Sequence, residues 1–86
     1  MRPYKLVVEY EVLDFIQGLR KNDQRYLHGL LVYLHFSPHS PNDRRVRGED
    51  GRDYFVHVRG KFAIKYWIDE PVKEVRVLDI HFVHFA

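Results

Sequence analysis

Histidines and basic residues are the side chains of this sequence that could carry out chemistry. The 86 residues include six histidines and fourteen lysines and arginines, and no cysteine. Imidazole exchanges protons near neutral pH, and cations stabilise the charge that grows on a reacting phosphate. RNA cleavage without a metal needs these groups: a base for the 2′-hydroxyl proton, an acid for the leaving oxygen and cations for the phosphate.

Basic residues concentrate in one stretch of the chain. Residues 44–65 hold seven basic residues against three acidic ones, whereas residues 1–43 are balanced and residues 66–86 are acidic by two. The stretch could bind nucleic-acid phosphates, but a solvated basic face would also explain it, and the formal net charge is only +2. The candidate nucleic-acid-binding residues are Arg44, Arg45, Arg47, Arg52, Lys61, Phe55 and Trp67.

The spacing of the histidines does not predict a metal site. His81 and His84 are three residues apart, so on a strand they point to opposite faces. His35 and His39 have helical spacing, but Pro38 ends the helix between them. We therefore expect no metal, and no other cofactor.

Length and composition predict a single domain spanning residues 1–86. With 45% hydrophobic and 15% aromatic residues, the chain can form a dense small core, and without cysteine it cannot use disulfides. No apolar run approaches the ~18 residues that cross a bilayer. We expect a cytoplasmic protein with no membrane partner.

Hydrophobic spacing predicts one strand, two helices and four further strands. Val12 and Leu27 each begin a series of apolar residues at helical spacing, and after a proline-containing loop at residues 37–43 the period changes to two. The expected strands are 4–10, 44–48, 54–59, 62–69 and 74–85, and the expected helices are 12–20 and 22–36. This β-α-α-β-β-β-β order predicts an α+β fold with both helices on one face of a mainly antiparallel sheet.

Alternation along the central hairpin predicts which side chains face the helices. Tyr54, Val56 and Val58 are expected in the core with the apolar positions of the next strand. The uncovered face is then expected to carry Phe55, His57, Arg59, Ala63, Lys65 and Trp67. Aromatics beside cations suit stacked bases and phosphates, although Phe55 and Trp67 could equally support a protein interface.

Two segments carry a resemblance to a known family. Arg45-Val46-Arg47-Gly48 and the run from Gly51 to Asp69, which includes Gly60-Lys61-Phe62-Ala63-Ile64-Lys65-Tyr66, resemble the RelE/ParE toxin superfamily of type II toxin-antitoxin systems. The family pattern is a K-L-x-G strand, a Y-x-hydrophobic-x-hydrophobic strand and then G-x-Y-R-hydrophobic-x-Y. The resemblance covers nearly the whole chain and implies a RelE/ParE-like fold and a partner antitoxin.

The resemblance also implies site residues. RelE-like members cleave mRNA on the ribosome, with basic residues at positions occupied here by Phe55 and His57, and with an arginine where this chain has Ala63. Lys65, two residues further on the same face, could supply the missing charge. The expected catalytic residues are His57, Lys65, Arg59, His81 and His84. A histidine on a strand is, however, often only hydrogen-bonded or solvent-facing, and His57 could be such a residue instead of a catalyst.

Three functions follow from the resemblance. The first is a metal-independent endoribonuclease, an mRNA interferase that inhibits translation with the ribosome and mRNA as partners. The second is a ParE-like topoisomerase (gyrase) inhibitor that acts by protein binding, which the absence of a cation at Ala63 favours. The third is a catalytically degenerate module that binds an antitoxin.

Overall fold

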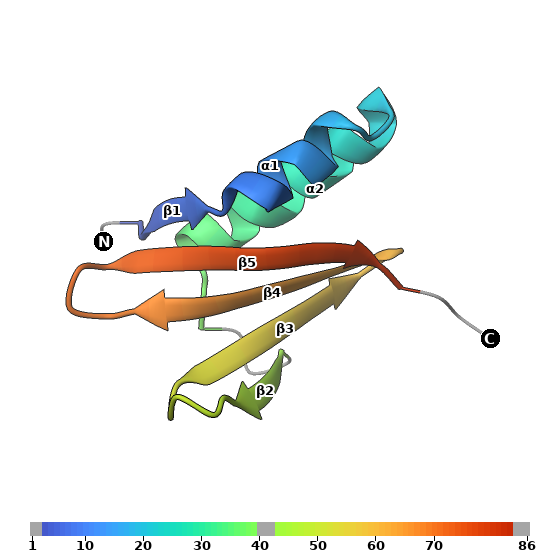
Figure 1. Ribbon diagram of the computed structural model, residues 1–86. Coiled ribbons are helices and arrows are strands. Elements are labelled where there is room, and N and C mark those ends of the chain that lie inside the picture. Colours follow the sequence, from blue (N-terminus) through green and yellow to red (C-terminus); the bar gives the residue numbers. More distant parts are fainter. Residues whose placement is uncertain (1–2, 40–42, 84–86) are drawn as a thin grey trace.

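The computed structural model describes residues 3–39 and 43–83, and in it two helices lie against one face of a five-stranded sheet (Figure 1). This is the α+β arrangement that the sequence predicts. The elements are β1 (Lys5–Val8), α1 (Tyr10–Gln17), α2 (Lys21–Phe36), β2 (Arg44–Arg47), β3 (Asp53–Arg59), β4 (Phe62–Asp69) and β5 (Glu74–Phe82).

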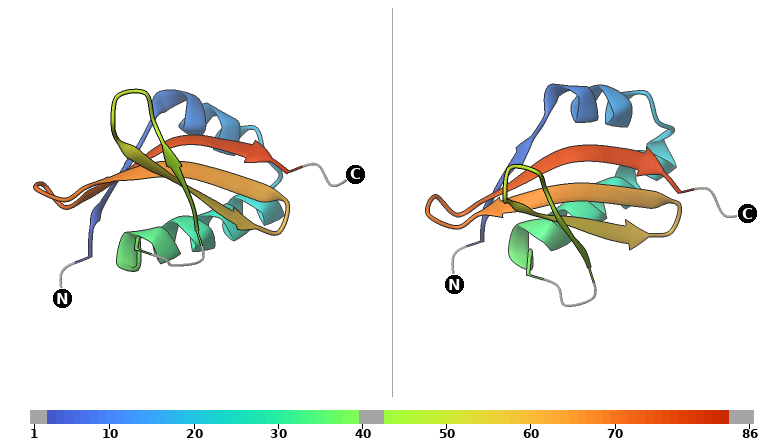
Figure 2. Two further views of the ribbon diagram at one scale, coloured as in Figure 1. Left: turned by 90° about the horizontal axis from the view of Figure 1, so that it is seen from below. Right: turned by 60° about the horizontal axis from the view of Figure 1, so that its bottom comes forward.

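The sheet has the strand order β1-β5-β4-β3-β2. β1 pairs with β5 in parallel, and every other pair is antiparallel. The last four strands therefore form a meander with β2 at one edge, while β1 occupies the other edge (Figure 1). The left view of Figure 2 looks onto the face without helices, which we call the uncovered face.

Apolar stripes on the two helices form the core with β4 and β5. Val12 of α1 and Leu27 and Leu34 of α2 are buried, which confirms the predicted helix faces. The sheet contributes Phe62, Ile64, Tyr66, Val75, Val77 and Ile80. Among the described residues no helix is long and apolar enough to cross a membrane.

Several element ends differ from the sequence predictions. β1 stops at Val8 because the Glu9 carbonyl accepts backbone hydrogen bonds from Val12 and Leu13 and thereby starts α1. α1 ends at Gln17, with Gly18 at its C-cap, and α2 begins at Lys21 with no side-chain cap. β5 ends at Phe82, and the predicted extension to Phe85 includes residues outside the described ones.

The predicted faces of β3 are wrong. Gly60 and Lys61 form a two-residue turn, so Arg59 pairs with Phe62 and the two side chains share the helix-covered face. It follows that His57, opposite Ile64, also lies on the helix side. Phe55, His57 and Arg59 therefore exchange faces with Tyr54, Val56 and Val58, because a shift of one residue turns every side chain over.

A bulge in β5 turns polar side chains away from the helices and onto the uncovered face. Lys65 pairs with Asp79 and Tyr66 pairs with Val77, so Leu78 is an extra residue in the strand. Before the bulge, Val77 faces the core. After it, Asp79 and its face-mate His81 lie on the uncovered face, whereas a regular strand would have turned them toward the helices.

Candidate functional site

Three polar residues lie together on the uncovered face of β4 and β5. Lys65 is the cross-strand partner of Asp79, and His81 follows two residues further on the same face. His81 Nδ1 lies 3.0 Å from Asp79 Oδ2. We call Lys65, Asp79 and His81 the open-face cluster.

The hydrogen bond to Asp79 fixes the role of each ring nitrogen of His81. A carboxylate only accepts, so Nδ1 carries the proton that it donates, and Nε2 is left for a ligand. The His81 side chain is 58% exposed, so Nε2 can meet a ligand from solvent. Lys65 is diagonal to His81, a relation that separates Cα atoms by about 7–8 Å in antiparallel sheets, which is within reach of one phosphate group.

Cations and aromatic rings border the open-face cluster. The Arg52 guanidinium lies 4.3 Å from the centre of the Trp67 ring, and that of Arg76 lies 5.8 Å from it. Lys65 Nζ lies 5.0 Å from the centre of the Tyr54 ring. These contacts place π-faces and positive charge side by side, which is the combination that single-stranded nucleic acids bind.

Tyr54 is held in place by Asp50. Its hydroxyl donates to Asp50 Oδ2 at 2.7 Å, and this bond raises the pKa of Tyr54 and lowers the pKa of Asp50. The Tyr54 ring therefore has a defined position on the uncovered face while its hydroxyl stays protonated at neutral pH.

The predicted nucleic-acid-binding arginines separate into two groups. Arg44 is the cross-strand partner of Val56 and shares the uncovered face with it, and Arg52 contacts Trp67 on that face. Arg45 and Arg47 point the other way and pair with Asp53 at 3.8 and 3.3 Å.

Lys61 and Phe55 lie apart from the open-face cluster. Lys61 is in the β3–β4 turn and forms an ion pair with Asp23 at 3.0 Å. Phe55 stacks on Tyr66 on the helix side, with ring centres 5.5 Å apart. Of the two aromatic residues predicted to stack on bases, only Trp67 is on the uncovered face.

His57 is buried, which corrects its expected position. It is 2% exposed, its ring stacks on Tyr33, and its Nδ1 lies 2.6 Å from Asp43 Oδ1. The Tyr66 hydroxyl donates to the other Asp43 oxygen and lies 3.0 Å from the Pro38 carbonyl oxygen. Burial raises the pKa of Tyr66 above its usual value, and the hydrogen bond to Asp43 raises it further. His57 and Tyr66 thus hold the Asp43 side chain, directly before β2.

The remaining predicted residues are distributed over the fold. Arg59 is exposed at the end of β3 on the helix side, and His84 lies outside the described residues. Ala63 lies between Val58 and His81 on the uncovered face and is 3% exposed, so neighbouring side chains cover it. Asp79 was missed by the sequence reasoning, although its spacing of two from His81 is a usable signal on a strand.

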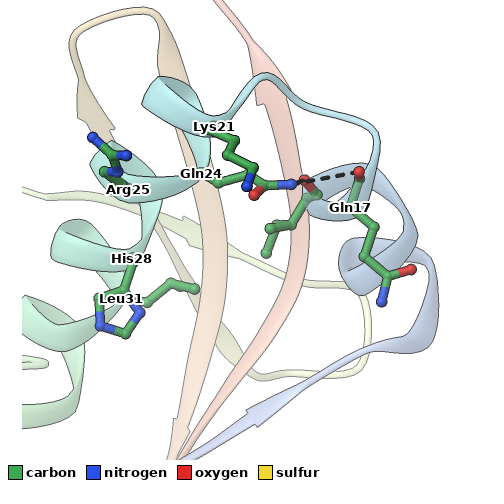
Figure 3. Close-up of a pocket in the computed structure, with 7 residues that line it drawn as sticks. Gln17, Lys21, Gln24, Arg25, His28 and Leu31 are labelled. Carbon is green, nitrogen blue, oxygen red and sulfur yellow. Dashed lines mark hydrogen bonds between the residues drawn. The ribbon is translucent and has the colours of Figure 1, made fainter.

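A cavity of about 520 Å³ lies between α1 and α2, away from the open-face cluster (Figure 3). Ile16 and Leu31 contribute apolar surface, while Lys21, Arg25 and His28 are exposed at its rim. The Gln24 amide donates to the Ile16 carbonyl at 3.0 Å and caps the end of α1. The described residues contain no group of three acidic, histidine or cysteine side chains that could hold a metal ion.

Comparison with solved structures identifies the fold. The chain superposes on RelE in the archaeal RelE-RelB complex from Pyrococcus horikoshii with a TM-score of 0.79 and 17% identity, over 93% of this chain and 94% of the other. The isolated Escherichia coli RelE toxin gives 0.79 and 18%, over 96% and 87%. The RelBE2 toxin-antitoxin complex from Mycobacterium tuberculosis gives 0.79 and 18%, over 94% and 99%.

The chain therefore has the fold of the RelE toxins, as its sequence resemblance predicts. No family model and no curated protein sequence matches it. At these identities the shared property is the fold, and the chemistry has to be argued from this chain's own residues.

Proposed function

We propose that this protein is the toxin of a type II toxin-antitoxin system and that it inhibits translation by cleaving mRNA on the ribosome. The observation that carries the proposal is the open-face cluster, in which Asp79 holds His81 beside Lys65. The cluster lies on an uncovered sheet face bordered by Arg44, Arg52, Arg76 and Trp67. The RelE fold supports the toxin assignment.

The cluster can perform the first step of RNA cleavage. His81 Nε2 accepts the proton of a ribose 2′-hydroxyl, whose oxygen attacks the adjacent phosphorus. The bond from phosphorus to the 5′-oxygen of the next nucleotide breaks, and this oxygen takes a proton from solvent water. A 2′,3′-cyclic phosphate is left on the other fragment. Asp79 stabilises the imidazolium formed at His81, and Lys65 stabilises the charge on the phosphate.

The partner we propose is an antitoxin protein. Solved structures of the same fold include a RelE-RelB complex and the toxin-antitoxin complex RelBE2. The ribosome is the other proposed partner. Arg44 of β2 and the cations around Trp67 supply the positive surface that ribosomal RNA phosphates require.

Inducible expression of variants tests the proposal. Growth and mRNA 5′ ends are followed together for the wild type, His81→Ala, Asp79→Asn and Lys65→Ala. Loss of a general base lowers the rate by about 10²–10⁴-fold, so His81→Ala should abolish growth arrest and the new ribosome-phased ends. His28→Ala is the matched control, because His28 is exposed on α2 among the helices.

Asp79 is proposed as a positioning residue, and its test is separate. Asp79→Asn keeps the shape of the side chain but removes the charge that stabilises protonated His81. We expect a lower cleavage rate and an altered pH profile in a purified translation reaction, whereas a merely structural role would lower the rate equally at every pH. Cleavage that persists unchanged in His81→Ala contradicts the proposed chemistry.

A topoisomerase inhibitor is the second candidate. Ala63 stands where the RelE pattern has an arginine, and Val58 and Val46 are 49% and 39% exposed on the same face. These residues give the uncovered face apolar surface that a protein partner could cover. Growth arrest without mRNA cleavage, together with gyrase-dependent DNA breaks, would favour this function, and the absence of any arrest would favour an antitoxin-binding module.

A further inference from the structure

We propose that a cavity at the edge of β3, apart from the open-face cluster, binds a phosphate group. The cavity has a volume of about 250 Å³. It lies where β2 no longer covers β3, because the pairing of these strands ends at Arg44 and Val56. Its walls are formed by Asp43, Arg44, Val56, His57, Val58 and Arg59.

His57 supplies the first observation for this site. The ring is 2% exposed and belongs to the wall of the cavity. Tyr33 stacks on the ring, and Nδ1 is engaged by Asp43. Nε2 is buried and has no hydrogen-bond partner among the described residues. An unpaired buried nitrogen destabilises a fold, so a ligand that pairs with it gains binding energy.

The surroundings of His57 determine which ligand group suits Nε2. The Asp43 side chain is 4% exposed and forms no ion pair with lysine or arginine among the described residues. A buried carboxylate is stabilised by a neighbouring positive charge, which an imidazolium at His57 provides. An imidazolium donates from both ring nitrogens, so a ligand that favours this form has to offer an acceptor to Nε2. An oxyanion meets this requirement.

Two arginines at the cavity favour an anion further. Arg44 and Arg59 both border it and are exposed, and neither forms an ion pair among the described residues. The one carboxylate of the wall, Asp43, is already occupied by His57 and Tyr66. The charge that remains at the cavity for a ligand is therefore positive. One guanidinium group can donate two parallel hydrogen bonds to two oxygens of the same phosphate.

The cavity is placed to extend an RNA-binding surface. Arg44 shares the uncovered face with Val56, while Arg59 lies on the helix side, so the site spans the edge of the sheet between them. If the proposed function holds, on which this site rests, the ligand is the phosphate of a nucleotide next to the cleaved one. A free phosphate compound offers the same chemistry, and the experiment separates the two sources.

Nuclear magnetic resonance on the full chain tests the site. Inorganic phosphate and a short single-stranded RNA are titrated separately while the ring nitrogens of His57 and the Nε–H of Arg59 are followed. We expect His57 Nε2 and Arg59 to shift together along one saturable curve. Shifts with both probes indicate a general phosphate site, and shifts with RNA alone indicate that the nucleic-acid backbone is the ligand.

Arg59→Ala is the decisive variant because Arg59 is exposed and its removal leaves the core intact. It should weaken the binding seen at His57 by about tenfold or more. Arg47→Ala is the matched control, since Arg47 lies on a neighbouring strand and pairs with Asp53, and it should change that affinity by less than about twofold. Equal losses in the two variants, or shifts over the basic surface that leave His57 unmoved, would overturn the proposal.

The test also separates this site from the proposed function. His81→Ala should stop cleavage and leave the phosphate response of His57 unchanged. If cleavage survives His81→Ala while His57 still responds to phosphate, the proposed chemistry fails and the cavity stands. If His57 does not respond to either probe while His81→Ala stops cleavage, the cavity proposal fails and the open-face cluster stands.

Discussion

Removal of the Asp43 carboxylate should destabilise the fold more than removal of any exposed carboxylate. Asp43 accepts hydrogen bonds from His57 and Tyr66, and both side chains of the His57–Asp43 pair are almost fully buried. In Asp43→Ala these two donors lose their shared acceptor inside the protein.

The magnitude follows from the burial of the pair. Leaving a buried donor without its acceptor costs about 1–3 kcal/mol, so removing the shared acceptor of two donors costs about 2–6 kcal/mol. A domain of this length has a total stability of roughly 4–13 kcal/mol, so the variant loses a large share of it. At about 4–8 °C for each kcal/mol, the melting temperature should fall by roughly 8–48 °C.

Urea unfolding followed by circular dichroism measures this loss, with Asp53→Ala as the control. Asp53 also contacts two basic residues, Arg45 and Arg47, but those pairs are exposed and should contribute about 0–1 kcal/mol. Tyr66→Phe alone should cost about 1–3 kcal/mol, because it deprives Asp43 of one donor.

A double-mutant cycle completes the experiment. In the Asp43→Ala background, Tyr66→Phe should cost at least ~1 kcal/mol less than in the wild type, because the acceptor is already gone. If Asp43→Ala is no more destabilising than Asp53→Ala, or if Asp43→Ala and Tyr66→Phe are additive, the buried hydrogen bonds of Asp43 do not stabilise the fold as we infer.

Three further outcomes are expected. Gly60→Ala should destabilise the domain by about 1–2 kcal/mol, since Gly60 has φ +57 and an added Cβ would lie 2.8 Å from the Tyr26 hydroxyl. Chemical unfolding measures this loss of stability, with Gly29→Ala as the control. The pKa of the Glu70 carboxyl is lowered to about 2, mainly by its hydrogen bond from Lys73. Its contribution to stability is therefore present above pH ~4.5 and disappears as the pH falls toward 2. Carbon NMR should show this pKa rising in Lys73→Ala. Trp67 is the single tryptophan, so RNA binding to the uncovered face should quench the protein's fluorescence, and unchanged fluorescence at saturating RNA would contradict that placement.

Helix faces and element order were predictable because they depend on local periodicity. The leucines of α2 recur at helical spacing, and Leu27 and Leu34 are indeed buried. The two-residue turn at Gly60 and Lys61 was predictable too, and such a turn also determines how its flanking residues pair. The residues that flank such a turn face the same way, so Arg59 had to follow Phe62.

The bulge at Leu78 shows what local patterns leave open. The apolar positions of β5 change phase from Val75 and Val77 to Ile80 and Phe82, a signal that the sequence contains but that strict alternation overlooks. Only pairing with β4 determines where the extra residue sits, and that choice brings Asp79 and His81 beside Lys65.

The sequence by itself thus determined the α+β class, the order of the elements and the side of each helix that is buried, since all three depend on neighbours within a few residues. The tertiary structure alone decided which of the two strand histidines, His57 or His81, is exposed. His57 became a buried partner of Asp43 and His81 reached the uncovered face, because strand register depends on hydrogen bonds between segments far apart in the chain.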